Sequence, residues 1–232
     1  MATTGICNSF KVEILQGGHC FNATQTGVSV TNTSGQVALT GLSSTAGLSD
    51  GMAVTGTNTQ AGAVIATITS ATALTMSLAS SGGAVTSATF TADVFKFALV
   101  KVSPSLTYSA TQTNIGTPGS GTPTTANLGT DEVAATGGYS SGGATLTNVT
   151  PALSSTTATT SFSPSPSYTS ATISTTAGII YNSSTRLGAA ATPLSGRTVG
   201  VYDFGGTQTV TGGTITFTMP VNAAGTAIIQ IA

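Results

Sequence analysis

The sequence predicts an all-β protein: an antiparallel β-sandwich of jelly-roll-like type, with one short N-terminal helix and an inserted small β domain. Short runs in which apolar and polar residues alternate recur along the chain, and Gly, Ser, Asn and Asp separate them. Only one stretch has helical spacing. Between residues 27 and 89 the chain contains no Phe, Tyr or Trp, unlike its flanks. We therefore predict a main domain of residues 1–26 and 90–232, with residues 27–89 inserted as a second, barrel- or sandwich-like domain.

Residues 6–16 predict the helix. This stretch contains no Thr, and Ile6, Phe10 and Ile14 recur at four-residue spacing, which places them on one helical face. Two glycines, at positions 17 and 18, end the pattern. We interpret the helix as a cover for one end of a sheet. The alternative is an arm that docks on a neighbouring subunit, since short terminal helices are otherwise poorly held.

Residues 27–89 predict six short strands, each bounded by turn-forming residues. In the fifth of them, Leu74, Met76 and Leu78 alternate with small or polar residues, so that one face is buried. The only charged residue of the segment is Asp50, which we place in a turn. The predicted strands span residues 28–31, 36–40, 52–55, 63–69, 73–78 and 84–90.

Residues 93–102 predict an interior strand of the main domain, because apolar residues occupy both of its faces. Pro104 then begins an irregular stretch that extends to Gly129. Within it, residues 116–122 carry two glycines at the spacing of a phosphate-binding loop, but Thr122 occupies the position where that motif requires lysine. We therefore predict a mobile surface loop without a phosphate site.

Asp131 and Glu132 are adjacent carboxylates. Adjacent residues of a strand point to opposite faces, so this pair is poorly arranged for acid–base chemistry unless a turn folds the two together. We interpret both residues as part of a solvated loop or as a turn cap.

The last part of the chain predicts the strands that hold the sandwich together. Residues 161–168 form an extended connector, and residues 172–181 return to a strand. Residues 196–219 read as two extended runs joined by a glycine-bracketed connection, which predicts a hairpin. Its second run alternates and ends at Pro220, and we place Asp203 at a strand end, where it closes a turn. The alternating residues are Ile215, Phe217 and Met219 on one face and Thr214, Thr216 and Thr218 on the other.

Charged residues make up only 5% of the chain, against roughly a quarter in an average soluble protein. The basic residues are scattered, so no patch can neutralise many phosphates, and we predict no nucleic-acid partner. A mean hydropathy of +0.32 with a surface of uncharged polar residues suits a protein of a packed assembly. The basic residues are Lys11, Lys96, Lys101, Arg186 and Arg197.

Apolar runs are too short to span a bilayer, and the first residues lack a signal-peptide pattern, so we expect a cytoplasmic product without a membrane partner.

Cys7 and Cys20 are the only cysteines, and we interpret both as buried thiols, with a disulfide as the alternative. His19 is the only histidine, and no motif around it indicates a Ser–His–Asp site. Cys7, His19 and Cys20, with Glu13 as a fourth ligand, are the one candidate zinc set, but an adjacent His–Cys pair is awkward for a closed tetrahedral site. We predict a protein that is not an enzyme, with no catalytic, cofactor-binding or metal-binding residues.

Four blocks of the main domain, residues 95–99, 131–146, 178–181 and 201–206, resemble in order and spacing a family of small virion proteins of tailed bacteriophages. Residues 7–15 are similar to the start of that family. The resemblance implies a structural virion protein without cofactor or catalytic residues. The inserted segment departs from the family, and its runs 48–57, 61–68 and 73–78 resemble a small β module of phage structural and bacterial surface proteins, where it serves as spacer or decoration.

The resemblance and the composition together favour a capsid decoration or cement protein that stabilises the head lattice by binding its assembled state. The expected partners are the major capsid protein or other virion proteins, the expected oligomer is a homotrimer that matches local capsid symmetry, and the expected location is the virion, assembled in the host cytoplasm. One alternative is a tail, baseplate or fibre component that contacts the host, although the inserted segment lacks aromatic residues for glycan binding. A second alternative, a secreted bacterial adhesin, is disfavoured by the missing signal peptide.

Overall fold

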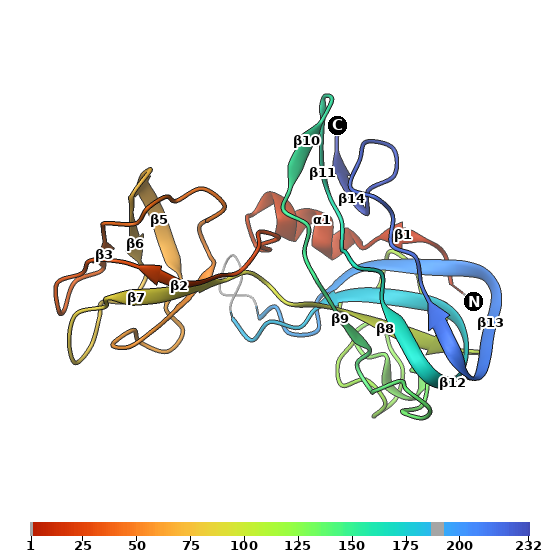
Figure 1. Ribbon diagram of the computed structural model, residues 1–232. Helices are drawn as coiled ribbons and strands as arrows, with labels where there is room; N and C mark the ends of the chain where they lie inside the picture. The colour runs from red at the N-terminus through yellow and green to blue at the C-terminus, as the bar shows by residue number, and fades with distance from the viewer. Residues whose placement is uncertain (1, 187–192) are drawn as a thin grey trace.

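The computed structural model describes residues 2–186 and 193–232 (Figure 1). The described chain is mostly β, with one α-helix, and its named strands pair in antiparallel sheets. The predicted all-β, sandwich-like class is therefore confirmed. Among the residues described, no helix has the length and apolar character needed to cross a membrane.

The main domain is built on a five-stranded sheet of order β1-β13-β12-β8-β9. The interior strand predicted from residues 93–102 is β8, which lies between β12 and β9 and buries side chains on both faces. That prediction is confirmed. β12 begins at Ser167, five residues before its predicted start. The strands are β1 (Gly5–Ile6), β8 (Phe95–Lys101), β9 (Ala144–Leu146), β12 (Ser167–Asn182) and β13 (Thr198–Thr216).

The hairpin predicted within residues 196–219 is wrong. The segment contains a single 19-residue strand, β13, which pairs with β12 along both halves. Ala177 pairs with Asp203, but Thr175 pairs with Gln208, so β13 bulges between these two pairs. Gly205 lies in this bulge with φ of 71°, a conformation that favours glycine. The glycines therefore bend the strand where the sequence suggested that they reverse it.

Asp203 is likewise not at a strand end. It lies inside β13, and its Oδ1 accepts a hydrogen bond from the backbone N–H of Gly205 at 3.1 Å. Its backbone N–H donates to Thr4 Oγ1 at 2.9 Å. The carboxylate thus shapes the bulge, which is a related but different role from closing a terminal turn.

Beyond the bulge, the β12–β13 ribbon curves back over the sheet (Figure 1). The ring of Phe217 stacks on that of Phe204, 4.8 Å between centroids, and the Tyr168 hydroxyl donates to the carbonyl of Phe97 at 3.0 Å. The predicted alternation is confirmed: the three apolar residues from Ile215 to Met219 pack against the main core, and the intervening threonines are exposed. β13 ends at Thr216, four residues before Pro220. One curled ribbon thus supplies part of both layers of the sandwich.

The predicted helix is α1 (Asn8–Leu15), which contacts β13 and buries Phe10 in the main core. Ile14 packs against the same core, as its spacing indicated. Ile6 also packs there, but from β1 (Gly5–Ile6) and not from the helix, which begins two residues later than predicted. A small sheet of order β10-β11-β14 stands next to the helix (Figure 1). Its strands are β10 (Ala152–Ser154), β11 (Thr157–Thr160) and β14 (Ile229–Ile231). The helix covers one end of the main sheet and leaves Val12 and Leu15 exposed.

Residues 25–91 form two three-stranded sheets, and each strand of these sheets pairs with another strand of the same segment. The segment has a hydrophobic core that is separate from the core of the main domain. In Figure 1 they stand to one side of the main domain. Each predicted strand has a counterpart, with ends that differ by a few residues. One sheet holds β2 (Gln25–Ser29), β7 (Ser87–Thr91) and β4 (Ala53–Thr55), and the other holds β3 (Ala38–Leu39), β6 (Ala73–Met76) and β5 (Ile65–Ser70).

Gly178 tests the packing of β12 on β8. A Cβ at this position would overlap the buried ring of Phe97. We expect Gly178→Ala to lower the free energy of unfolding by about 1–3 kcal/mol, the usual cost of overpacking a core. The matched control is Gly206→Ala, because nothing lies within 4 Å of a Cβ there. Urea denaturation of both variants measures the difference, and equal stabilities would contradict this packing.

Candidate functional site

Four of the six acidic residues are buried, which is unusual in a chain with so little charge. A carboxylate removed from water is costly unless cations or hydrogen-bond donors compensate for the lost hydration. The contacts of each buried carboxylate therefore define its role. The four are Glu13, Asp93, Asp131 and Glu132.

Asp93 is the centre of a network at the point where the chain leaves and re-enters the main domain. Its carboxylate accepts hydrogen bonds from Arg186 Nε at 2.6 Å and Nη2 at 2.8 Å, a bidentate ion pair. Oδ2 also accepts from the backbone N–H of Cys20 and from Asn182 Nδ2, each at 2.9 Å. The backbone N–H of Asp93 donates to the Cys20 carbonyl at 3.0 Å. Both connections to the inserted segment are thereby tied to β12.

His19 extends this network to the helix. Its side chain is fully buried, with Nδ1 3.0 Å from Asn182 Nδ2 and Nε2 2.8 Å from Glu13 Oε2. The amide nitrogen of Asn182 can only donate, so Nδ1 accepts and Nε2 carries the proton that is donated to Glu13. Glu13 forms a further ion pair with Arg197. Both ring nitrogens of the only histidine are thus occupied by structural partners.

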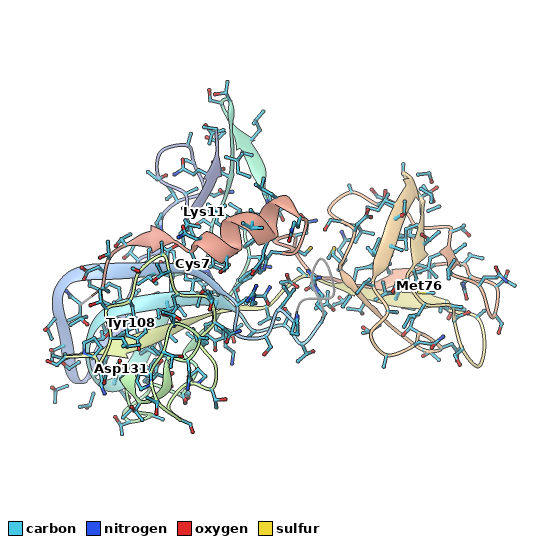
Figure 2. The ribbon with its side chains drawn as sticks, turned by 180° about the vertical axis from the view of Figure 1, so that it is seen from behind. Cys7, Lys11, Met76, Tyr108 and Asp131 are labelled. Atoms are coloured by element: carbon cyan, nitrogen blue, oxygen red, sulfur yellow. The ribbon has the colours of Figure 1, made fainter. Side chains whose placement is uncertain are left out.

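Asp131 is fully buried, so its interpretation as a solvated loop residue is wrong. The alternative, a turn cap, is in keeping with the hydrogen bonds that its carboxylate accepts from the backbone N–H groups of Ser105 and Leu106. Figure 2 shows it near Tyr108 in the main domain. Oδ2 accepts from the Tyr108 hydroxyl at 2.9 Å and from the backbone N–H of Ser105 at 2.8 Å, and Lys101 Nζ lies 3.0 Å from Oδ1. Burial alone would raise the pKa of Asp131, but these donors outweigh it and hold the pKa below its usual value. Burial and the Asp131 charge raise the pKa of Tyr108, which stays a neutral donor.

Glu132 is also buried, which again contradicts the solvated-loop interpretation. Its oxygens accept from the Tyr139 hydroxyl at 2.8 Å, Ser141 Oγ at 2.7 Å and the backbone N–H of Gly142 at 2.5 Å. The Tyr139 oxygen in turn accepts from the backbone N–H of Leu99 at 3.0 Å, so Glu132 ties the turn around Ser141 to β8. Asp131 and Glu132 have no partner in common, in keeping with their poor arrangement as an acid–base pair.

The glycine loop at residues 116–122 lies on the surface, as predicted. Its backbone bonds to the segment that follows: Gly119 N–H donates to the Gly129 carbonyl at 3.0 Å, and Thr130 N–H donates to the Gly121 carbonyl at 3.2 Å. The amide nitrogen of Asn127 contacts the Thr122 carbonyl at 3.2 Å. These contacts bind the loop to its own chain, and its mobility stays a prediction.

Cys7 and Cys20 are buried free thiols, as interpreted from the sequence. Burial raises the pKa of Cys7, and Cys20 Sγ lies 3.0 Å from Ser49 Oγ. Within the described ranges, no group of three or more His, Cys, Asp or Glu side chains could hold a metal ion. Within the candidate zinc set, Glu13 Oε2 and His19 Nε2 lie 2.8 Å apart.

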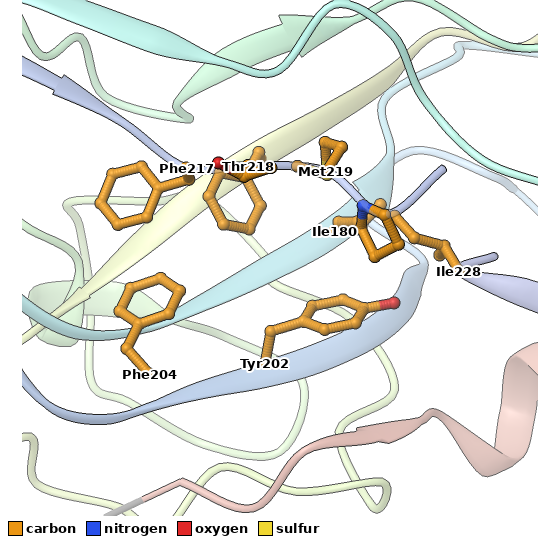
Figure 3. Close-up of a pocket in the computed structure, with 9 residues that line it drawn as sticks. Ile180, Tyr202, Phe204, Phe217, Thr218, Met219 and Ile228 are labelled. Atoms are coloured by element: carbon orange, nitrogen blue, oxygen red, sulfur yellow. The ribbon is translucent and has the colours of Figure 1, made fainter. Parts of the chain in front are cut away.

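The returning end of β13 encloses an apolar pocket that sequence reasoning missed (Figure 3). The pocket lies between the main sheet and the chain that follows Thr216, and its volume is about 200 Å³. The rings of Phe97, Phe204 and Phe217 pack against one another along it, with Phe97 and Phe217 5.7 Å apart. No spacing in the sequence indicates this pocket, because it exists only where the bent ribbon faces the sheet.

The ion pair between Asp93 and Arg186 can be tested by Arg186→Ala. Removal of one partner leaves a buried charge, which costs about 3–5 kcal/mol. We expect a loss of this order in urea denaturation. Lys11→Ala also removes a positive charge but from an exposed side chain, and we expect it to change stability by less than about 0.5 kcal/mol. Equal effects of the two substitutions would show that the network at Asp93 contributes little.

The lowered pKa values of Glu13 and Asp131 predict a pH dependence of stability. Unfolded carboxyl groups titrate near about 4, so the unfolded chain binds protons before the folded one. The stability that both groups contribute is therefore fully present at a pH above their pKa values in the unfolded chain. It is lost as the pH falls through their lower pKa values in the folded chain. Denaturation at pH 6 down to pH 2 measures this decline. Asp131→Asn should remove the part of this pH dependence that Asp131 contributes, and Tyr108→Phe should remove a fraction of that part. If the stability of the parent protein does not change over this pH range, the lowered pKa values of Glu13 and Asp131 are refuted.

Comparison with protein-family models, with curated proteins and with solved structures finds no match to this chain. The roles of Asp93, Asp131 and Glu132 are therefore inferred from their contacts, and in all three the contacts join separate segments of the backbone. The structure thus contains two kinds of candidate site. One kind is the buried polar networks that fix the fold, and the other is an apolar pocket at the surface of the main domain.

Proposed function

We propose that this protein is a non-enzymatic structural component of a tailed-bacteriophage virion and that it decorates or cements the capsid. The observation that carries the proposal is the distribution of polarity. Charges are few and largely used inside the protein, whereas large apolar side chains are exposed around α1 and the small sheet. A surface of this kind suits association with other proteins.

The exposed apolar residues lie on elements that are neighbours in space. Leu15 at the end of α1 is 82% exposed and Ile231 in β14 is 52% exposed, and both line one groove between the helix and that strand. Leu153 in β10 of the same small sheet is 73% exposed. A contiguous apolar surface is unfavourable in water and is stabilised when a partner covers it.

The buried polar networks support a structural role rather than a chemical one. His19, the only histidine of the chain, is enclosed by Glu13 and Asn182. Asp131 and Glu132 are held by backbone donors and tyrosines. Such contacts fix loops in place. Because these carboxylates are occupied by structural donors, they do not face a substrate as a pair.

The resemblance of the main-domain blocks to virion proteins supplies the setting. A protein that binds across neighbouring capsid subunits stabilises the lattice because it binds the assembled state and not the separated subunits. In this proposal the partners are the major capsid protein or other virion proteins, and three copies match the local three-fold symmetry of a capsid. The inserted segment, which stands to one side of the main domain in Figure 1, extends outward as decoration.

The test is binding to empty capsids. The parent protein should co-sediment with capsids and scatter light as a trimer at micromolar concentration. Leu15→Glu places a charge on a largely exposed position, so it should fold normally yet bind at least about tenfold more weakly, because a buried unpaired charge is costly at an interface.

Thr57→Glu is the matched control, since it adds the same charge to an exposed site of the inserted segment. It should bind like the parent. A stable monomer that does not bind capsids would overturn the proposed function. Equal binding of the Leu15→Glu and parent proteins would place the contact surface elsewhere and would contradict the role assigned to the helix.

A further inference from the structure

The apolar pocket of the main domain has the size of a small-molecule site. Its volume is about 200 Å³. A dry apolar cavity of about 150 Å³ accommodates benzene, so this pocket has room for one ring with a short substituent. Typical drug-sized sites are larger, about 300 Å³ and above. The volume therefore limits the ligand to a small molecule.

The walls of the pocket are aromatic and aliphatic. One side is the packed set of rings formed by Phe97, Phe204 and Phe217. Met219 and Ile228 contribute to the lining elsewhere (Figure 3). Aromatic faces and edges interact favourably with a further ring at offset or edge-to-face geometry. The thioether of methionine also makes favourable contacts with rings. These walls favour a cyclic ligand.

The walls carry no charged side chain. The polar side chains among them are Thr218, which is exposed, and Tyr202, whose hydroxyl oxygen is buried without a hydrogen-bond partner among the described residues. Burial, with a smaller effect from the neighbouring Cys7, raises the pKa of Tyr202, so its phenol stays neutral. A charged ligand would lose its hydration here without an ion-pair partner. The pocket therefore selects an uncharged ligand.

The pocket is also accessible. Phe204, Phe217 and Met219 are only partly buried, although each packs against the main core. The cavity thus lies open on the surface of the main domain, and a ligand can enter without unfolding of the chain. This accessibility distinguishes the pocket from a closed void in the core, although the fully buried Ile180 forms part of its lining.

We propose that this pocket binds a small uncharged aromatic or alicyclic molecule. The ring of the ligand lies against Phe204 and Phe217, and its edge contacts Met219 and Ile228. This inference is independent of the capsid-binding role, which depends on the surface of α1 and the small sheet.

The experiment is a titration of the full chain, labelled at Ile and Met methyl groups, with indole. We expect saturable shifts of the Ile180, Met219 and Ile228 methyl resonances, while those of Ile65 and Met76, in the separate core of the inserted segment, stay unchanged. Benzoate carries one ring and a charge, and it should bind at least about tenfold more weakly than indole, because the walls hold no cation to pair with a carboxylate.

Two variants locate the site. Thr218→Phe places a ring at the rim of the pocket from an exposed position and should weaken indole binding at least about tenfold. Thr214→Phe, at an exposed position of the same segment outside the pocket lining, is the matched control and should bind as the parent does. The proposal is overturned if indole produces no saturable shift at its solubility limit, if the Ile65 and Met76 signals shift equally, or if both variants bind alike.

Discussion

The bend in the β12–β13 ribbon is the constraint on which the main domain depends. The two strands pair along both halves, and β13 absorbs the bulge between Asp203 and Gln208 where Gly205 takes a left-handed conformation. A straight ribbon of this length would extend past the sheet and expose the apolar residues of its far end. The bend brings Phe217 onto Phe204 and so converts one long pairing into two facing layers.

The same bend explains why a pocket lies in the main domain. Residues after Thr216 cross the sheet at a distance that Phe97, Phe204 and Phe217 do not fill completely, and a space of about 200 Å³ remains. The inserted segment has its own core, so its packing does not constrain this region. Fold and candidate binding site therefore have one physical origin, the return of a curved ribbon over its own sheet.

The scarcity of charge has opposite consequences inside and outside the protein. Inside, Asp93 and Asp131 each gather a cation and several neutral donors, because a buried carboxylate is stable only when its oxygens are compensated. These networks join segments that are distant in sequence. Outside, few charges remain, and the groove between α1 and β14 is lined mainly by apolar residues, with Lys11 and Gln230 as the polar side chains among them, which suits a surface that is covered in an assembly.

The sequence by itself determined the local elements: the helix, the six strands of the inserted segment, the interior strand β8 and the alternation from Ile215 to Met219. Each depends on a periodicity that neighbouring residues carry. Only the tertiary structure decided that Asp131 and Glu132 are buried, that Gly205 bends a strand, and that four aromatic rings border a pocket. The donors to Asp131 lie about 25 positions away and those of Asp93 up to 93 positions away. No local pattern records such partners, because burial is set by which distant segments meet.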